Sequence, residues 1–291
     1  MDLDIIPNGL AAGSLYALIA VGFNILYRPT NVFNFAQGDL VMLGAMIGAS
    51  ALASGLPWLL ALAAAAVFVG VIALLENAVA VAPVVRRSSV SHAWIISTLA
   101  YSLIIDNLVG HAWGPDPIRV DPPAPLSMTT FTVAGMRTSS YQIALIVGTA
   151  VMILLIERFY RTRSGKAVMA VAEDRDAALL RGIDPGRLSR WSFFLGGGFA
   201  AVAGLLASPV LYASTQLGPA LLVKGFEAAA IGGVGNNRGA LVAGWILGLA
   251  EALGGSVLSP GYQQASTFVL LLVILLIQPR GLFGQPEARN V

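Results

Sequence analysis

Residues 40–75 read LVMLGAMIGASALASGLPWLLALAAAAVFVGVIALL, a run of 36 residues without a single charge. An apolar helix needs about 20 residues to cross the hydrocarbon core of a membrane, so this run is too long for one crossing. Gly55 and Pro57 interrupt it, and both residue types end helices. The run therefore predicts two membrane helices, over about 40–54 and 58–81.

The rest of the chain has the same character. Of its 291 residues, 57% are hydrophobic and 11% are charged, whereas about a quarter of residues are charged in an average globular protein. This composition predicts an all-α, multi-pass bundle of transmembrane helices. A net charge of +2 gives no basic field for nucleic acid. With no cysteine and two isolated histidines, a disulfide, a thiolate nucleophile or a zinc site is not expected.

Other uncharged runs predict further spans, over about 10–27, 88–113, 141–156, 191–212 and 266–277. Between residues 228 and 250 the apolar pieces are short, because Glu227, Arg238 and Glu251 cut them. Such pieces predict a helical hairpin or discontinuous helices in a protein-lined interior. The expected count is nine spans, or eight if 228–237 or 40–54 is re-entrant.

Basic residues predict the orientation. Eight of the 17 lie between residues 158 and 190, which the positive-inside rule places in the cytoplasm. This puts the N-terminus outside and the C-terminus in the cytoplasm, with only Arg119, Arg137 and Lys224 as exceptions among the basic residues. The proline-rich connection 114–140 is then an ordered outside loop. No segment reads as a soluble domain, so residues 1–291 are expected to form a single transmembrane domain.

The segment after residue 173 predicts a short, explicitly terminated helix. Asp174 is a good N-cap, Gly182 suits the left-handed residue past the end, and Pro185 prevents continuation. Two helical turns are not stable alone in water. An apolar patch is ringed by charges here: the patch is Ala177, Ala178, Leu180 and Ile183, and the ring is Glu173, Arg175, Asp176 and Arg181. The patch either enters a groove in a partner or packs back on the ends of the spans.

Small and polar residues mark the spans themselves. The GxxxG pairs Gly9/Gly13, Gly44/Gly48 and Gly244/Gly248 predict close helix packing. Ionisable groups inside a membrane are costly and are candidates for function; the polar residues in or beside the spans are Asn24, Asn34, Gln37, Asp39, Glu76, Asn77, Asp106, Asn107, Glu227 and Glu251. Asp106 and Glu251 are expected to be buried and hydrogen-bonded.

The chain carries no P-loop and no catalytic constellation, so it is not expected to be an enzyme, and ATP would have to be used by another chain.

Several motifs together resemble the permease subunits of branched-chain amino acid ABC importers. They are the segments at 9–18 (GLAAGSLYAL), 34–39 (NFAQGD), 165–174, 177–183, 227–235 and 279–284 (PRGLFG), so the likeness covers nearly the whole chain. Gln37 and Asp39 stand where that family often has His and Glu. The same superfamily includes permeases for urea and short amides, which leaves the substrate open between these classes.

The resemblance implies a translocating subunit of the bacterial inner membrane, with residues 161–190 as the cytoplasmic segment that couples it to an ATPase. The coupling residues would be Glu173, Asp174, Arg175, Ala177, Ala178, Leu180, Gly182 and Ile183. Candidates for the translocation pathway are Tyr16, Asn24, Asn34, Phe35, Gln37, Gly38, Asp39, Glu227, Gly232 and Gly233. The implied partners are ABC ATPase subunits holding ATP and Mg²⁺, a second permease that is related or identical, an extracytoplasmic binding protein, and membrane lipid. No cofactor or metal is expected on this chain.

A rival hypothesis is a secondary transporter driven by an ion gradient. The short pieces near 228–250, Asp106 and Glu251 favour it, because ion-coupled transporters use broken helices and buried carboxylates. A passive channel is a weaker alternative, since a channel has no need of a capped helix that seeks a partner.

Overall fold

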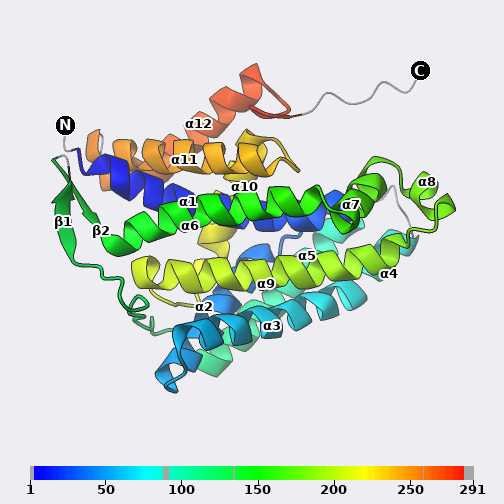
Figure 1. The fold of residues 1–291 in the computed structure, drawn as a ribbon, viewed down its shortest axis with the longest axis horizontal. Coiled ribbons are helices and arrows are strands. Elements are labelled where there is room, and N and C mark those ends of the chain that lie inside the picture. The colour runs from blue at the N-terminus through cyan, green and yellow to red at the C-terminus, as the bar shows by residue number, and fades with distance from the viewer. Residues whose placement is uncertain (1–2, 88–91, 134, 258, 285–291) are drawn as a thin grey trace. The chain divides into compact units, whose positions relative to one another are not determined.

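The computed structural model describes residues 3–87, 92–133, 135–257 and 259–284, and these are almost entirely helical (Figure 1). The helices are α1 (Ile5–Thr30), α2 (Gln37–Ala53), α3 (Trp58–Glu76), the π-helix η1 (Asn77–Val81), α4 (Ala82–Arg87), α5 (Ala93–Trp113), α6 (Ser140–Tyr160), α7 (Arg163–Glu173), α8 (Arg175–Leu180), α9 (Pro185–Leu211), α10 (Leu217–Gly232), α11 (Asn237–Val257), the 3₁₀ turn η2 (Pro260–Tyr262) and α12 (Gln263–Ile277). The strands are β1 (Thr130–Val133) and β2 (Met136–Ser139).

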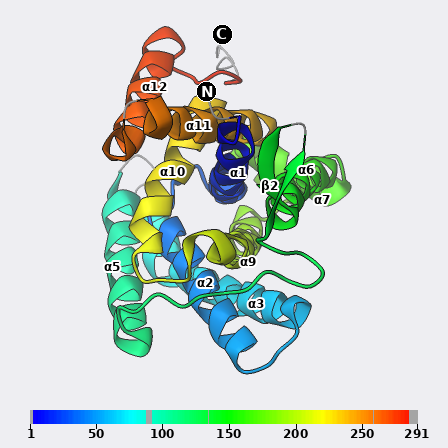
Figure 2. The same cartoon turned by 90° about the vertical axis from the view of Figure 1, so that its left-hand side faces the viewer.

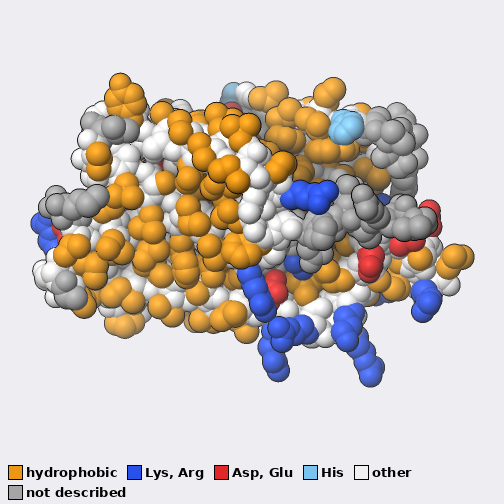
Figure 3. Space-filling view, turned by 90° about the horizontal axis from the view of Figure 1, so that it is seen from above, with side chains coloured by type: hydrophobic (Ala, Val, Ile, Leu, Met, Phe, Trp, Pro, Cys, Tyr) orange, Lys and Arg blue, Asp and Glu red, His pale blue; other side chains and the backbone are white. Residues whose placement is uncertain are grey.

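Among the described residues, six helices are long and apolar enough to cross a membrane: α1, α3 with its extension to Val85, α5, α6, α9 and α11. α2 and α12 are shorter apolar helices. Large apolar side chains stay exposed along them, such as Leu59 at 80% and Leu276 at 81%, and hydrophobic atoms cover most of the face drawn in Figure 3. Such a surface is stable against lipid and costly against water. The predicted class, an all-α multi-pass protein, is therefore confirmed.

The chain divides into two compact units, described separately here. The first unit comprises residues 1–24, 126–154 and 224–291, and the second comprises 25–125 and 155–223. In the second unit, α2 contacts α3, α5 and α9 (Figure 2). Small residues bring these backbones together: Gly44 faces Ala201, and Gly204 faces the carbonyl of Val41. The predicted role of the Gly44/Gly48 pair in close packing is confirmed.

Glycines also determine the packing of the first unit. Gly9 and Gly13 of α1 meet Gly248 and Gly244 of α11, so the two GxxxG pairs face each other. A Cβ atom added at Gly9 would lie 2.9 Å from the carbonyl oxygen of Gly248. The backbones approach so closely that neither helix can carry a larger residue there, as expected of helix association without a hydrophobic driving force.

Two features of the first unit differ from the sequence-based expectation. α11 is one continuous helix of 21 residues, so Glu251 lies within a helix and does not end the predicted piece 239–250. Of the two predicted alternatives, a helical hairpin and discontinuous helices, the structure shows the first: α10 and α11 are whole helices joined by a short turn. Part of the expected outer loop forms an antiparallel hairpin, in which Thr130 pairs with Ser139. Arg137 Nε of this hairpin donates a hydrogen bond of 2.7 Å to Asp4.

The short helix after residue 173 forms as predicted. Asp174 Oδ1 accepts hydrogen bonds from the N–H groups of Asp176 at 3.0 Å and Ala177 at 2.9 Å. The chain leaves α8 through Gly182, whose φ of +79° is the left-handed conformation that favours glycine. Pro185 then occupies the first turn of α9, behind an N-cap formed by Asp184.

Candidate functional site

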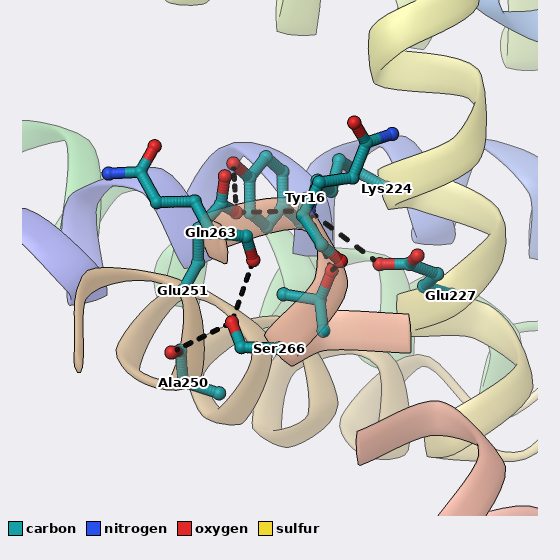
Figure 4. Close-up of polar contacts among 9 residues, drawn as sticks. Tyr16, Lys224, Glu227, Ala250, Glu251, Gln263 and Ser266 are labelled. Carbon is teal, nitrogen blue, oxygen red and sulfur yellow. Dashed lines mark hydrogen bonds and ion pairs between the residues drawn. The ribbon is translucent and has the colours of Figure 1, made fainter. Parts of the chain in front are cut away.

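A cluster of charged and hydroxyl side chains lies between four helices of the first unit (Figure 4). We call it the lysine cluster; its members are Tyr16 of α1, Lys224 and Glu227 of α10, Glu251 of α11 and Thr267 of α12. Glu227 lies three residues after Lys224, so one face of α10 presents both side chains. The cluster thus joins helices that are far apart in the sequence.

Lys224 is the centre of this cluster. Its ammonium group donates a hydrogen bond of 2.8 Å to Thr267 Oγ1 and lies 3.2 Å from Glu251 Oε2. Tyr16 donates its hydroxyl proton to the same Glu251 oxygen at 2.8 Å. Glu227 is farther away, with 3.9 Å between its Oε2 and the ammonium nitrogen. The lysine and Glu251 are therefore tightly paired, while Glu227 receives only longer-range attraction.

Two of the charged groups in this cluster are buried, and burying a charge costs free energy unless the charge is paired. Lys224 is 8% exposed and Glu227 is fully buried. Within the described part of the chain, neither carboxylate oxygen of Glu227 accepts a hydrogen bond. Two carboxylates face one ammonium group, so the ionised cluster has one negative charge in excess. A buried charge of this kind needs a partner.

Lys224 is the member of this cluster that sequence reasoning missed, because its charge was assigned to the outside surface. The structure instead places it inside a helix, where it is buried. The available signal was its spacing from Glu227: opposite charges three residues apart within an apolar segment can neutralise each other.

A second set of polar groups lies in the second unit, and we call it the amide cluster. It comprises Asn34, Gln37, Asp39, Glu76, Thr98 and Ser102. Asn34 Nδ2 donates a hydrogen bond of 2.9 Å to Glu76, and the hydroxyl of Ser102 donates one to Asp39. Asn34, Asp39 and Glu76 are all at most 3% exposed. The NFAQGD motif thus supplies a buried, largely hydrogen-bonded group.

Gln37 is the exception in this cluster. Its side chain is completely buried, yet among the described residues neither its amide nitrogen nor its oxygen has a hydrogen-bond partner. An amide left unpaired away from water costs about 1–3 kcal/mol. It could donate to and accept from a polar solute. Next to it, Gly38 packs against the backbone of Gly218, and the ring of Phe35 stacks on Trp94 with centroids 6.4 Å apart.

Three further pathway candidates hold a turn together. Asn24 Oδ1 accepts a hydrogen bond of 2.8 Å from the N–H of Gly235, and Gly232 packs against Gly239. Gly233, with φ of +89°, packs against Gly284 of the PRGLFG motif. Asn24, Gly232 and Gly233 therefore fix the turn between α10 and α11, and their contacts belong to backbone packing.

The coupling candidates lie in and around α8, in the second unit. Leu180 is 91% exposed and Leu179 is 52% exposed, whereas Ala178 is 4% exposed. The patch predicted from sequence is thus wrong in one member, because Ala178 faces the protein. Ile183 is half-buried. The exposed apolar surface consists of Leu179, Leu180 and Ala177, with Leu179 as a member that the sequence did not single out.

The two deep carboxylates predicted to be hydrogen-bonded behave differently. Glu251 accepts the hydrogen bond from Tyr16 and pairs with Lys224, as described above, so its predicted hydrogen bonding is confirmed, but it is half-buried and not buried as predicted. Asp106 of α5 is half-buried, and no hydrogen bond to its carboxylate is formed by the residues that the structure describes.

Comparison with known proteins adds independent support. The family described as "Branched-chain amino acid transport system / permease component" matches residues 5–278. The high-affinity branched-chain amino acid transport system permease protein LivH of Escherichia coli is 34% identical, over 98% of this chain and 96% of its own. BraD of Pseudomonas aeruginosa is 31% identical over the same shares, and a probable LivH permease of Methanocaldococcus jannaschii is 29% identical over 96% of this chain and 92% of its own.

No solved structure gives a significant match to the chain. The family match nevertheless covers nearly every described helix, and the relatives cover the chain almost from end to end. Apolar membrane helices and two buried polar clusters are features that a transport protein requires. The chain therefore belongs to the family of branched-chain amino acid transport system permease components.

Proposed function

We propose that this chain is the membrane-spanning permease subunit of an ABC importer that moves branched-chain amino acids across the bacterial inner membrane. The family and the permease relatives support this function. Separate ATPase subunits would bind ATP and Mg²⁺, a second permease, related or identical, would complete the pathway, and an extracytoplasmic binding protein would deliver the substrate. The chain itself provides passage and has no catalytic activity.

The observation that carries this proposal is the exposed tip of α8. A leucine that is 91% exposed at the end of a capped two-turn helix stabilises nothing within its own chain. Apolar surface of this kind is explained by burial in a partner. We assign Leu179 and Leu180, with Ala177, to a groove on an ATPase subunit. Asp174 and Gly182 fix the ends of the helix, so that movement of the ATPase is passed to α7 and α9 on either side.

The experiment is Leu180→Asp in the complete transporter, with co-purification of the ATPase and substrate uptake as readouts. Because Leu180 is exposed, the substitution should leave the permease folded while the ATPase is lost and uptake falls to background. Leu56→Asp is the matched control, since Leu56 is also exposed but lies between α2 and α3; it should retain the ATPase. Normal ATPase binding by Leu180→Asp would refute the coupling role.

For the topology we propose nine spans, with the N-terminus outside and the C-terminus in the cytoplasm. This orientation is supported by the order of α1, α2, α3, α5, α6, α9, α10, α11 and α12, which places α7 and α8 with the basic segment on the inner side. The chain has no cysteine, so single cysteines can report sidedness directly. Thr129→Cys should react with an impermeant maleimide in intact cells, and Arg187→Cys should react only after the membrane is opened. The reverse pattern would overturn the orientation.

We propose that the pathway uses the lysine cluster and the amide cluster. A branched-chain amino acid is a zwitterion with an apolar tail. Within the first unit the carboxylate of Glu227 is suited to its ammonium group, and within the second unit the unpaired amide of Gln37 is suited to its polar groups. Reconstituted transporter should take up labelled leucine or isoleucine in preference to urea or acetamide. Uptake of urea alone would assign the chain to the short-amide branch of the superfamily.

An ion-driven secondary transporter is less well supported than the sequence indicated, because α11 continues through Glu251, where the sequence suggested that an apolar piece ends. Vesicles that contain the permease without an ATPase should show no uptake under an imposed proton or sodium gradient.

A further inference from the structure

A cavity of about 290 Å³ lies in the second unit, beside the start of the coupling helix. Its walls come from the end of α1, from the π-helix η1 with α4, and from the N-terminal ends of α8 and α9. Arg175 and Arg190 line it together with the hydroxyl-bearing residues Thr30 and Ser189. A π-helix is wider than an α-helix and is often found at functional sites.

The lining of this cavity is positively charged. None of the described residues that line it is acidic, and within the described chain neither Arg175 nor Arg190 forms an ion pair. The neighbouring carboxylates of Asp174 and Asp184 cap α8 and α9 through backbone N–H groups. Arg175 and Arg190 are both exposed, and two guanidinium groups beside one partly open cavity favour an anion there, since arginine matches phosphate and carboxylate in a bidentate manner.

Neutral donors extend the same site. Asn77 is 3% exposed, and its Nδ2 donates a hydrogen bond of 2.9 Å to the hydroxyl oxygen of Ser189. With its oxygen occupied as an acceptor, Ser189 keeps its own hydroxyl proton to donate. The cavity therefore combines two charged donors with an oriented hydroxyl, which is a donor set for phosphate oxygens.

The position of the cavity indicates where the phosphate comes from. η1 and α4 continue the apolar span Trp58–Val85, and Leu75 and Val79 on this span are 51% and 69% exposed. The cavity thus borders a lipid-facing surface, and in the proposed orientation it lies at the cytoplasmic end of the span. Basic pockets between membrane helices on that side bind anionic lipid headgroups.

We propose that this cavity binds the phosphate group of an anionic phospholipid such as phosphatidylglycerol, held by Arg175 and Arg190. Because Arg175 is the first residue of α8, the bound lipid connects the coupling helix to α9 and to the span that ends at η1. The lipid would thereby restrict the movement of the coupling helix relative to α9 and to that span. The assignment to the cytoplasmic leaflet and the role of α8 as a coupling helix rest on the proposed function; the anion site itself does not.

The test is lipid retention by the full-length permease, measured by native mass spectrometry while phosphatidylglycerol is titrated into detergent. Arg175→Gln with Arg190→Gln should weaken binding roughly thirtyfold, since each arginine near a headgroup contributes about 1 kcal/mol. Arg187→Gln is the matched control: Arg187 lies on the same helix but does not line the cavity, and its variant should bind lipid like the wild type. Equal thermal melting of the variants excludes misfolding as the cause.

Two further titrations separate the sources of the anion. Phosphatidylcholine, which has no net charge, should not compete, and inorganic phosphate should compete only weakly because it lacks the acyl chains. Equal binding of phosphatidylglycerol by the double variant and the wild type would overturn the site. If the double variant kept its lipid but lost its ATPase, the arginines would instead bind an acidic side chain of the partner. Neither readout requires transport, so failure here and failure of the importer function are distinguishable.

Discussion

Replacement of Lys224 by Met gives the sharpest test of the lysine cluster. The substitution removes the ammonium group that hydrogen-bonds Thr267 and lies 3.2 Å from Glu251. It leaves Glu251 with only the hydroxyl of Tyr16, and it leaves the fully buried Glu227 with no cation nearby. Methionine has nearly the same length as the lysine stem, so the loss of charge, and not a cavity, accounts for the effect.

Removal of one partner from a buried ion pair costs about 3–5 kcal/mol, because the other charge stays buried. The side chain of Glu251 is 21% exposed, so water can relieve part of its penalty, and we expect a loss of about 3 kcal/mol. The assay is thermal or denaturant unfolding of the purified permease in detergent. Lys166→Met is a natural control, since Lys166 is the only other lysine in the chain and is exposed; it should unfold like the wild type.

A rescue separates electrostatics from packing. Adding Glu227→Gln and Glu251→Gln to Lys224→Met removes the charges that need the lysine, so most of the lost stability should return. If Lys224→Met is as stable as Lys166→Met, or if the triple variant is less stable than the single one, the cluster is not an ion-pair network and the reasoning fails.

Three other predictions follow from local geometry. Gly13→Ala should destabilise the protein by about 1–3 kcal/mol, because its Cβ would overlap the backbone of Gly244 and Trp245; Gly110→Ala, at an open helical position, should be neutral or slightly stabilising in the same unfolding assay. Asp174→Ala should cost α8 about 1 kcal/mol of helix stability, seen as faster hydrogen exchange of the amides at 176–180, while Asp174→Asn should keep most of the protection. Hydrogen bonds from the backbone and side chain of Arg137 lower the pKa of Asp4 below its usual 3.8. The contact between Asp4 and Arg137 should therefore hold above pH 3.8 and be lost as the pH falls through the lowered pKa. Hydrogen exchange of the Arg137 amide will report this loss, and Asp4→Asn should abolish its pH dependence.

Local rules explain what the sequence could predict. The apolar runs gave the membrane helices, because length and hydropathy suffice to recognise a span. The caps of α8 could be predicted at Asp174 and Gly182, because a cap depends only on its immediate neighbours. The GxxxG pairs predicted close packing, although their pairing of Gly9 and Gly13 with Gly248 and Gly244 required the fold.

What could not be predicted depends on charges from different helices that neutralise one another in the fold. Glu227 and Glu251 looked like interruptions of apolar segments, and Lys224 was counted among the basic residues on the outside, because a hydropathy pattern counts each charge separately. In the fold these charges oppose one another across α10 and α11, and α11 continues through Glu251 without a break. The burial of Ala178 and the β1–β2 hairpin likewise depend on contacts that no single segment encodes.

The self-contained ends of α8 have an evolutionary consequence. Asp174, Gly182 and Asp184 fix the two ends of this segment through local hydrogen bonds and backbone conformation, so the stretch between them can be exchanged as a unit. A chimeric permease that carries this segment from a paralogue should bind the paralogue's ATPase while it keeps its own substrate. Under the proposed coupling role, recognition of the ATPase and recognition of the substrate can thus change independently.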